Sequence, residues 1–285
     1  MILLSLILAH LIADFFLQSD EMVREKLKNL KKHMLHHFIV LLPATLLFWG
    51  LSFDFAKPLK YVVLPILFLL GTHFLIDFLK IKLLDKTAGK QNMKKLFYFI
   101  ADQIIHLAMI ITASHLFFKV TFSGLLEKGI ELLTENSSLS ILNSVLFIII
   151  IVILVTSVSG HIIRILLGTL PDQLLSFEGR YSFKNERKEE QMNSAGGLVE
   201  EYTYYTFNKH DLSRGKLIGY IERLLVIILT FYSAYPAIAF IVTAKSIARF
   251  KQMDDRNWAE YFLLGTLTSM FLGIFFGLLL REVLI

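Results

Sequence analysis

The chain contains no cysteine among its 285 residues. A disulfide, a thiolate metal ligand and a cysteine nucleophile are therefore all excluded. Any metal ion has to be held by nitrogen and oxygen atoms, which means by histidine and carboxylate side chains. Without cysteine, the sequence also does not define the redox state of its compartment.

Several motifs of well-known enzyme classes are absent as well. The sequence has no GxxxxGK[ST], GxSxG or HExxH pattern, so it gives no grounds for a P-loop NTPase, an α/β-hydrolase or a zincin. The segment 1–17 lacks a basic start and an AxA-like cleavage site. We therefore interpret it as a retained transmembrane helix and not as a signal peptide.

Long apolar runs dominate what is present. The chain is 55% hydrophobic with a mean hydropathy of +0.61. Its apolar runs repeatedly reach the roughly 20 residues that cross a bilayer. The sequence therefore predicts an all-α fold, a polytopic transmembrane helical bundle of about eight spans. We expect these spans near residues 2–19, 35–53, 61–80, 97–118, 140–168, 217–234, 236–250 and 259–280.

The basic residues fall mostly on one side of these spans. Of the 29 lysines and arginines, 21 lie in the segments 20–34, 80–96, 171–216 and 249–256, and five lie in the alternate loops. The positive-inside rule then places both termini outside and the basic loops in the cytoplasm, as in a multi-pass protein of the cell membrane. These loops explain the net charge of +5, so we predict no nucleic-acid binding.

The predicted spans divide the chain into four regions. Residues 1–118 form a four-helix bundle, and residues 119–170 hold an outer loop and the fifth span. Residues 171–216 form a polar cytoplasmic segment, in which we expect a lid or a partner surface and which includes the β-prone EYTYYTF at 201–207. Residues 217–285 form a three-helix C-terminal bundle.

The last predicted span carries a small residue at every fourth position. Such a stripe lets a second helix approach closely. We favour packing within the chain, and a homodimer through the stripe is the alternative. The stripe consists of Gly265, Ser269, Gly273 and Gly277.

Two copies of one pattern, HxxxDF, lie inside long apolar segments, at 10–15 and 73–78. At positions i and i+4 of a helix, the histidine and the aspartate lie on one face and can present two ligands to one point. Each copy is followed by a basic loop and another span, which suggests a parallel two-helix repeat. A third pair, Asp102 and His106, runs in the opposite order.

These pairs share one depth, in the cytoplasmic half of the bilayer, where ionisable side chains usually face a bundle interior or a polar cavity. We predict a divalent metal site with zinc or manganese as candidates, although each pair can also simply hydrogen-bond within itself or to a neighbouring helix. Asp102 and His106 are assigned to acid–base catalysis. His33, in the basic loop, is expected to be solvated. The predicted metal ligands are His10, Asp14, His36, His37, His73 and Asp77.

A second charged set lies in the C-terminal spans. Snorkelling and ion pairing explain such residues most often, and the glutamate can pair with the lysine or with the second arginine. The alternative is a substrate-binding site, in which the cations hold a phosphate or a lipid headgroup beside the metal. The residues of this set are Glu222, Arg223, Lys245 and Arg249.

Over nearly its whole length the chain resembles a bacterial membrane family of unknown activity, domain of unknown function 3307, in AHLIADFFLQSD, THFLIDF, ADQIIH, GKLIGYIERLL, AKSIARF and AEYFLLGTLTS. The resemblance implies that the protein is located in the bacterial inner membrane. The first half is similar, more distantly, to predicted membrane-bound metal-dependent hydrolases. That similarity implies metal ligands at His10, Asp14, His36 or His37, His73 and Asp77.

Three functions fit these residues. The leading hypothesis is a metal-dependent hydrolase at the cytoplasmic leaflet that acts on a phosphoester or a lipid-linked substrate. The second is an ion or proton-coupled transporter or channel, because ion binding and proton relay also require ionisable groups at depth. The third is a membrane signalling or defence component whose segment 171–216 binds a protein partner.

Overall fold

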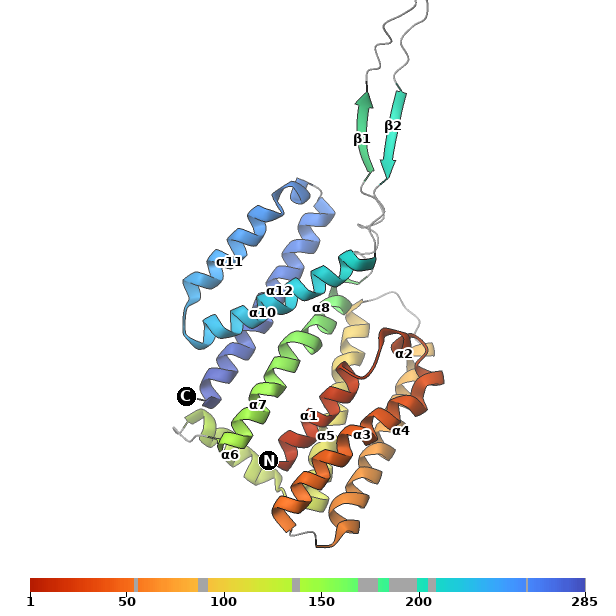
Figure 1. Ribbon diagram of the computed structural model, residues 1–285, viewed down its shortest axis with the longest axis vertical. Coiled ribbons are helices and arrows are strands. Elements are labelled where there is room, and N and C mark those ends of the chain that lie inside the picture. Colours follow the sequence, from red (N-terminus) through yellow and green to blue (C-terminus); the bar gives the residue numbers. More distant parts are fainter. Residues whose placement is uncertain are drawn as a thin grey trace, which may run out of the picture.

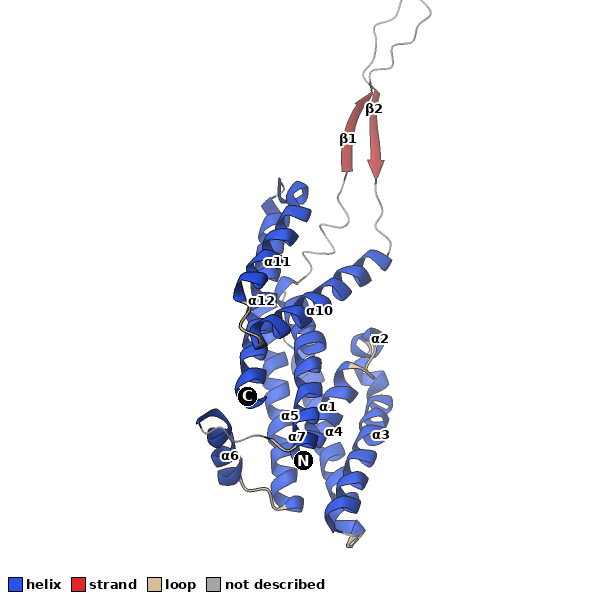
Figure 2. Ribbon diagram, turned by 60° about the vertical axis from the view of Figure 1, so that its left-hand side comes forward, coloured by secondary structure: helices blue, strands red, loops and turns tan. Residues whose placement is uncertain are grey.

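The structure, a computed structural model, describes residues 1–53, 56–86, 92–134, 139–168, 179–184, 199–204, 209–254 and 256–284. All of its long elements are helices (Figure 1 and Figure 2). They are α1 (Ile2–Phe15), α2 (Asp20–Arg24), α3 (Lys26–Phe53), α4 (Leu64–Lys86), α5 (Asn92–Phe118), α6 (Phe122–Thr134), α7 (Ile141–Ile153), α8 (Ser159–Leu167), α10 (Lys209–Phe231), α11 (Tyr235–Ala248) and α12 (Arg256–Leu284).

Short irregular turns and one hairpin complete the described chain. A π-helical turn, η1 (Leu59–Val63), opens α4, and a second, η2 (Leu154–Val158), joins α7 to α8. A 3-10 turn, η3 (Phe250–Asp254), precedes α12. The antiparallel strands β1 (Gly179–Lys184) and β2 (Val199–Tyr204) form the hairpin. The β-prone segment thus begins as a strand, and the all-α prediction omitted this hairpin.

The two ends of the helical bundle carry different connections. In Figure 1 the N-terminus, α6 and the turn from α3 into α4 lie toward the lower end, whereas α2 lies at the opposite, upper end of α3 and α4 and the hairpin lies farther up. The segments rich in lysine and arginine are therefore separated from the connections that are poor in them. Most of the segment 171–216 lies outside the described residues, so the lid or partner surface expected there stays a prediction.

Five helices of the described chain, and not eight, are long and apolar enough to cross a membrane. They are α3, η1 with α4, α5, α7 to α8, and α12. The helices α1 and α11 are apolar but have only 14 residues each. A helix of that length rises about 21 Å, which is less than the roughly 30 Å of a bilayer's hydrocarbon core. Hydropathy therefore located these helices but overstated the length of the first one.

The basic loop predicted before the second span is mostly helical. Ser19 caps α2, because its Oγ accepts a hydrogen bond from the backbone N–H of Met22 at 3.3 Å. The next helix, α3, begins at Lys26, nine residues earlier than its apolar run suggests. Lysine and leucine favour helix, and long basic side chains can reach water from a helix end. The early start places His33 one turn before His37 on the same helix.

The helices α1, α3, α4 and α5 pack around one apolar core. This core fills the half of the four-helix unit that contains the N-terminus of α1 and the turn between α3 and α4. A second cluster packs α7 and α8 against α1 and α5. The buried members of the first core are Ile2, Leu6, Ala9, Leu41, Tyr61, Val62, Ile66, Leu69, Ile110, Ala113 and Phe118.

Three residues of the small-residue stripe on α12, Ser269, Gly273 and Gly277, face α10, whereas Gly265 faces Leu167 of α8. A Cβ atom built on Gly273 would lie 2.8 Å from Val226 Cγ1, and one built on Gly277 would lie 2.7 Å from Thr230 Cβ. Real Cβ atoms do not approach neighbours so closely, so glycine is required for this contact. The prediction that the stripe packs within the chain is confirmed for Gly273 and Gly277, and the homodimer stays a prediction.

Replacing Gly277 with alanine will destabilise the packing of α12 on α10. The added methyl group meets Thr230, so the helices have to move apart, at a cost of about 1–3 kcal/mol. Thermal unfolding in detergent measures the effect. The matched control is Gly71→Ala on α4, where an added Cβ meets nothing within 4 Å. Equal melting temperatures for the two variants would contradict the packing described here.

Candidate metal centre

Four helices of the N-terminal unit each contribute two ionisable side chains to one cluster. In every case the two residues lie four positions apart, so they share a helix face. The cluster lies beyond the apolar core, in the half of the unit where the lysine-rich segments begin. Its members are His10 and Asp14 of α1, His33 and His37 of α3, His73 and Asp77 of α4, and Asp102 and His106 of α5.

Imidazole nitrogens from three helices converge on the carboxylate of Asp14. The Nε2 atom of His37 lies 2.9 Å from Asp14 Oδ1, and those of His33 and His73 lie 3.4 and 3.8 Å from the same oxygen. The Nε2 atom of His10 lies 3.7 Å from Asp14 Oδ2. Five side chains thus direct their donor atoms toward one small volume, which is the arrangement that a metal ion requires.

Two further carboxylates each bond to a lysine with one oxygen only. Lys26 donates to Asp77 Oδ1 and Lys80 donates to Asp102 Oδ2, both at 2.6 Å. The other oxygens, Asp77 Oδ2 and Asp102 Oδ1, are buried and accept no hydrogen bond. A buried carboxylate oxygen without a donor is costly, so these two oxygens fit a cation as their ligand.

The hydrogen bond of His106 fixes which of its ring nitrogens is free. Its Nδ1 lies 2.8 Å from the backbone oxygen of Asp102. A carbonyl oxygen can only accept, so Nδ1 carries the proton and the neutral ring has its lone pair on Nε2. That Nε2 is buried and has no hydrogen-bond partner. Metal-bound histidines typically donate their other N–H to such a carbonyl.

Three groups in the described chain bring at least three such donor atoms within 4.8 Å of one another. The first group combines three histidines with one aspartate, and the second combines two histidines with one aspartate. The third combines two aspartates with one histidine, and the second shares one residue with each of the others. Imidazole and carboxylate together suit zinc, manganese or iron. The groups are His10, Asp14, His37 and His73; His33, His73 and Asp77; and Asp77, Asp102 and His106.

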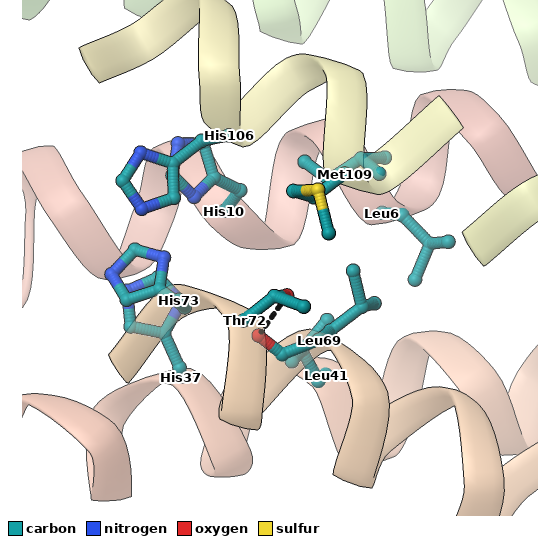
Figure 3. A pocket seen from close by; sticks show the side chains of 10 residues that line it. Leu6, His10, His37, Leu41, Leu69, Thr72, His73, His106 and Met109 are labelled. Carbon is teal, nitrogen blue, oxygen red and sulfur yellow. Dashed lines mark hydrogen bonds between the residues drawn. The ribbon is translucent and has the colours of Figure 1, made fainter. Parts of the chain in front are cut away.

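A small cavity adjoins the histidines on the side of the apolar core. Four imidazoles line one side of it and apolar side chains line the other (Figure 3). It has room for roughly one water molecule. Its lining comprises His10, His37, His73, His106, Leu6, Leu41, Leu69, Thr72, Met109 and Ile110.

The structure brings together seven of the eight side chains that the sequence assigned to metal binding or catalysis. The exception is His36, which belongs to none of the three groups and is half-buried next to His37 on α3. The expectation that His33 is solvated is wrong, because only 2% of it is exposed. Its helix starts earlier than predicted and turns it inward, where its Nε2 lies 3.2 Å from that of His73.

The contacts of two lysines with the cluster were not predicted from the sequence. Lys26 and Lys80 are partly exposed, with 20% and 22% of their side chains accessible. In the sequence they are two of many basic residues in positive-inside segments. Only the packing of helices shows that each reaches a carboxylate on another helix, so no local signal distinguishes them.

The C-terminal charged set forms its own interactions. Lys245 donates to Glu222 at 2.6 Å, which confirms that these residues form an ion pair. The Arg249 guanidinium lies 5.9 Å from the ring centre of Phe262. Among the residues that the structure describes, no hydrogen bond or ion pair joins this set to the His/Asp cluster. The assignment of these residues to substrate binding therefore has no support from their contacts.

Arg223 has a structural role and is not available to a substrate. Its Nε donates to the backbone oxygen of Val155 at 2.6 Å, and its Nη2 donates to that of Thr156 at 3.2 Å. Its Nη1 lies 3.4 Å from Ser269 Oγ. A π-helical turn shifts backbone carbonyls out of the regular α-helical pattern, and this buried guanidinium satisfies two of those of η2. It thereby ties α10, η2 and α12 together.

One part of the chain matches a known protein family. Residues 2–128 match a family model described as "Protein of unknown function (DUF3307)". This range contains all eight residues of the cluster and both lysines. No curated protein and no solved structure matches the chain.

Proposed function

Residues 2–128 form a domain of the family described as protein of unknown function (DUF3307), and from its site we propose a metal-dependent hydrolase embedded in a membrane. Its substrate is a phosphoester, either free or linked to a lipid. The observation that carries the proposal is the convergence of four histidines and an aspartate on one volume, with further buried carboxylate oxygens directed to the same interior. Ionisable groups at such depth are retained for function.

The residues of the site suit the binding of a divalent ion. His10, Asp14, His37 and His73 offer four ligand atoms, and any three of them would suffice for a catalytic zinc site, whose fourth position is left for water. A divalent ion held there supplies a Lewis acid for a phosphoryl oxygen and activates water as a nucleophile near neutral pH. Hydrolysis adds that water to phosphorus and breaks the bond to the leaving oxygen, which takes the proton.

The lysines supply the contacts for an anionic substrate. Lys26 and Lys80 lie beside the carboxylates and are partly exposed, while the cluster behind them is buried. A phosphate oxygen that approaches from this end meets an ammonium group first. An ammonium group binds phosphate as a point charge. The same lysines hold Asp77 and Asp102 by one oxygen each, which orients the other oxygen inward.

The charge distribution supports a site that opens to the cytoplasm. The lysine-rich segments flank the C-terminal end of α1, the start of α3, the end of α4 and the start of α5, which is the end of the unit that holds the cluster. By the positive-inside rule this end faces the cytoplasm. We therefore propose that the substrate enters from the cytoplasmic leaflet.

The packing favours an enzyme over an open channel. The apolar core of α1, α3, α4 and α5 fills the half of the unit opposite the lysines. The cavity between this core and the histidines has room for about one water molecule. A conducting path needs a line of water or polar groups across the membrane. In the four-helix unit, as the structure describes it, apolar packing takes the place of such a path.

Replacing His37 with alanine tests the proposal. We expect the purified variant to lose most of its bound metal and its hydrolysis of a p-nitrophenyl phosphodiester, and chelation of the wild-type protein to abolish the same activity. The matched control is His36→Ala, one position away on α3 and outside the cluster, which will retain both. Substoichiometric metal that neither substitution changes would overturn the proposal.

A further inference from the structure

The two helix pairs of the N-terminal unit repeat each other beyond the HxxxDF pattern. Residues of α1 match residues of α4 at an offset of 63, and residues of α3 match residues of α5 at an offset of 69. Seven of the matched positions are buried in both copies, which extends the repeat beyond the one motif. Buried counterparts are Leu6 and Leu69, His10 and His73, Leu30 and Phe99, His33 and Asp102, His37 and His106, Leu41 and Ile110, and Thr45 and Ser114.

The cluster therefore consists of two corresponding halves. The first half supplies Asp14 and His37, and the second supplies Asp77 and His106 at the matching positions. The halves differ at one cluster position, where the first has His33 and the second has Asp102. This single difference makes the first half rich in imidazole and the second half rich in carboxylate.

The second half contains its own set of ligand atoms. Asp77, Asp102 and His106 bring one donor atom each within 4.8 Å of one another. Their exposed fractions are 1%, 6% and 3%, and Asp77 Oδ2, Asp102 Oδ1 and His106 Nε2 have no hydrogen-bond partner. These three residues therefore combine a ligand-like grouping with one buried, unpartnered atom on each side chain, and none of the three belongs to the first group.

We infer that the site binds two divalent ions of different character, one at the first ligand group, which also takes His73 from the second half, and one at the third ligand group, Asp77, Asp102 and His106. The first group, His10, Asp14, His37 and His73, selects a borderline ion such as Zn²⁺, because imidazole suits it. The third group selects a harder ion such as Mn²⁺, because carboxylates suit it. The second group, His33, His73 and Asp77, shares one residue with each of the other two and so connects the two ion sites. His106 then acts as a ligand and not as the acid–base residue that its spacing suggested.

The inference rests on the proposed function only in the role it gives the two ions, which is to hold the attacking and the leaving oxygen of one phosphoester. The binding of two ions does not depend on that role. Metal content tests it without any activity measurement. The metal-free full-length protein in detergent receives one equivalent of Zn²⁺ and an excess of Mn²⁺, followed by gel filtration and elemental analysis. We expect one zinc and one manganese per chain, with the manganese also visible by electron paramagnetic resonance.

Replacing Asp102, the one cluster residue that differs from its counterpart, His33, shows which ligand group holds which ion. Asp102→His gives the second half the donors of the first, so manganese binding weakens by about tenfold or more and a second zinc binds when zinc is supplied. His37→Ala lowers zinc and leaves manganese bound. A single ion per chain in the wild-type protein, or two ions whose identity Asp102→His does not change, would overturn the inference.

The two proposals fail separately in these experiments. Two unlike ions without hydrolysis of any phosphoester would refute the hydrolase and leave the metal assignment standing. One ion with full hydrolysis would refute the two-ion inference and leave the hydrolase standing. The wild-type stoichiometry alone decides the second case, so it does not depend on whether a variant folds.

Discussion

Purified protein with Asp14 replaced by asparagine will bind the first metal ion at least about 100-fold more weakly and will lose nearly all hydrolysis. Asp14 is the one carboxylate that contacts imidazoles from three helices, with four Nε2 atoms within 3.8 Å of its oxygens. An asparagine keeps the shape but removes the negative charge that balances the cation. Competition with a fluorescent zinc chelator measures the affinity.

A matched carboxylate outside the cluster serves as the control for this substitution. Glu25 lies between α2 and α3, is exposed, and pairs only with Lys28 at 3.0 Å. Glu25→Gln removes the same charge and will leave metal affinity and hydrolysis unchanged. Equal metal affinity in Asp14→Asn and wild type would show that Asp14 merely hydrogen-bonds to its neighbours.

Replacing Arg223 with methionine will lower the free energy of unfolding by roughly 3 kcal/mol or more, the largest loss of stability among the substitutions proposed. The side chain is buried, and its charged donors hold the backbone oxygens of Val155 and Thr156 in the π-helical turn. Methionine fills much of the volume but donates no hydrogen bond, so both oxygens lose their guanidinium partner. The Thr156 oxygen still accepts the backbone N–H of Ser159, but each lost hydrogen bond from a charged donor costs roughly 1.5–3 kcal/mol. Thermal unfolding in detergent will show the decrease in melting temperature.

Two further substitutions identify the cause of that loss. Arg256→Met removes an arginine whose partner, Glu260, is also exposed, and we expect no measurable change in melting temperature. Arg223→Lys keeps the charge but cannot reach two carbonyl oxygens with a planar fork, so its stability falls between those of wild type and Arg223→Met. A methionine variant as stable as wild type would show that η2 does not need the guanidinium.

These two predictions also separate the two parts of the molecule. Asp14 lies in the four-helix unit and Arg223 lies where α10 meets η2. Asp14→Asn should therefore change metal binding with little loss of stability in the metal-free protein. Arg223→Met should change stability while the protein that remains folded still binds metal.

The errors of the sequence analysis have physical causes that particular residues show. His33 was placed in solvent because hydropathy ends the apolar run near residue 35, whereas the helix continues through basic residues to Lys26. For Arg223 the sequence left snorkelling, ion pairing and substrate binding open, because its charge is visible in the sequence, whereas the π-helical turn whose carbonyl oxygens it bonds is not. The sequence contained a signal for His33 in its HxxxH spacing with His37, and none for η2.

The sequence by itself determined that the chain is a helical membrane-type protein and that histidine and aspartate pairs share helix faces, because hydropathy and the helical period are local properties. It also placed these pairs at one depth. Tertiary packing alone decided that four helices direct eight side chains into one cluster and that Lys26 and Lys80 each hold one carboxylate oxygen. Lys26 and Asp77 are 51 positions apart, and the stacked rings of His10 and His106 are 96 positions apart, so these contacts depend on how the helices pack and not on any local pattern.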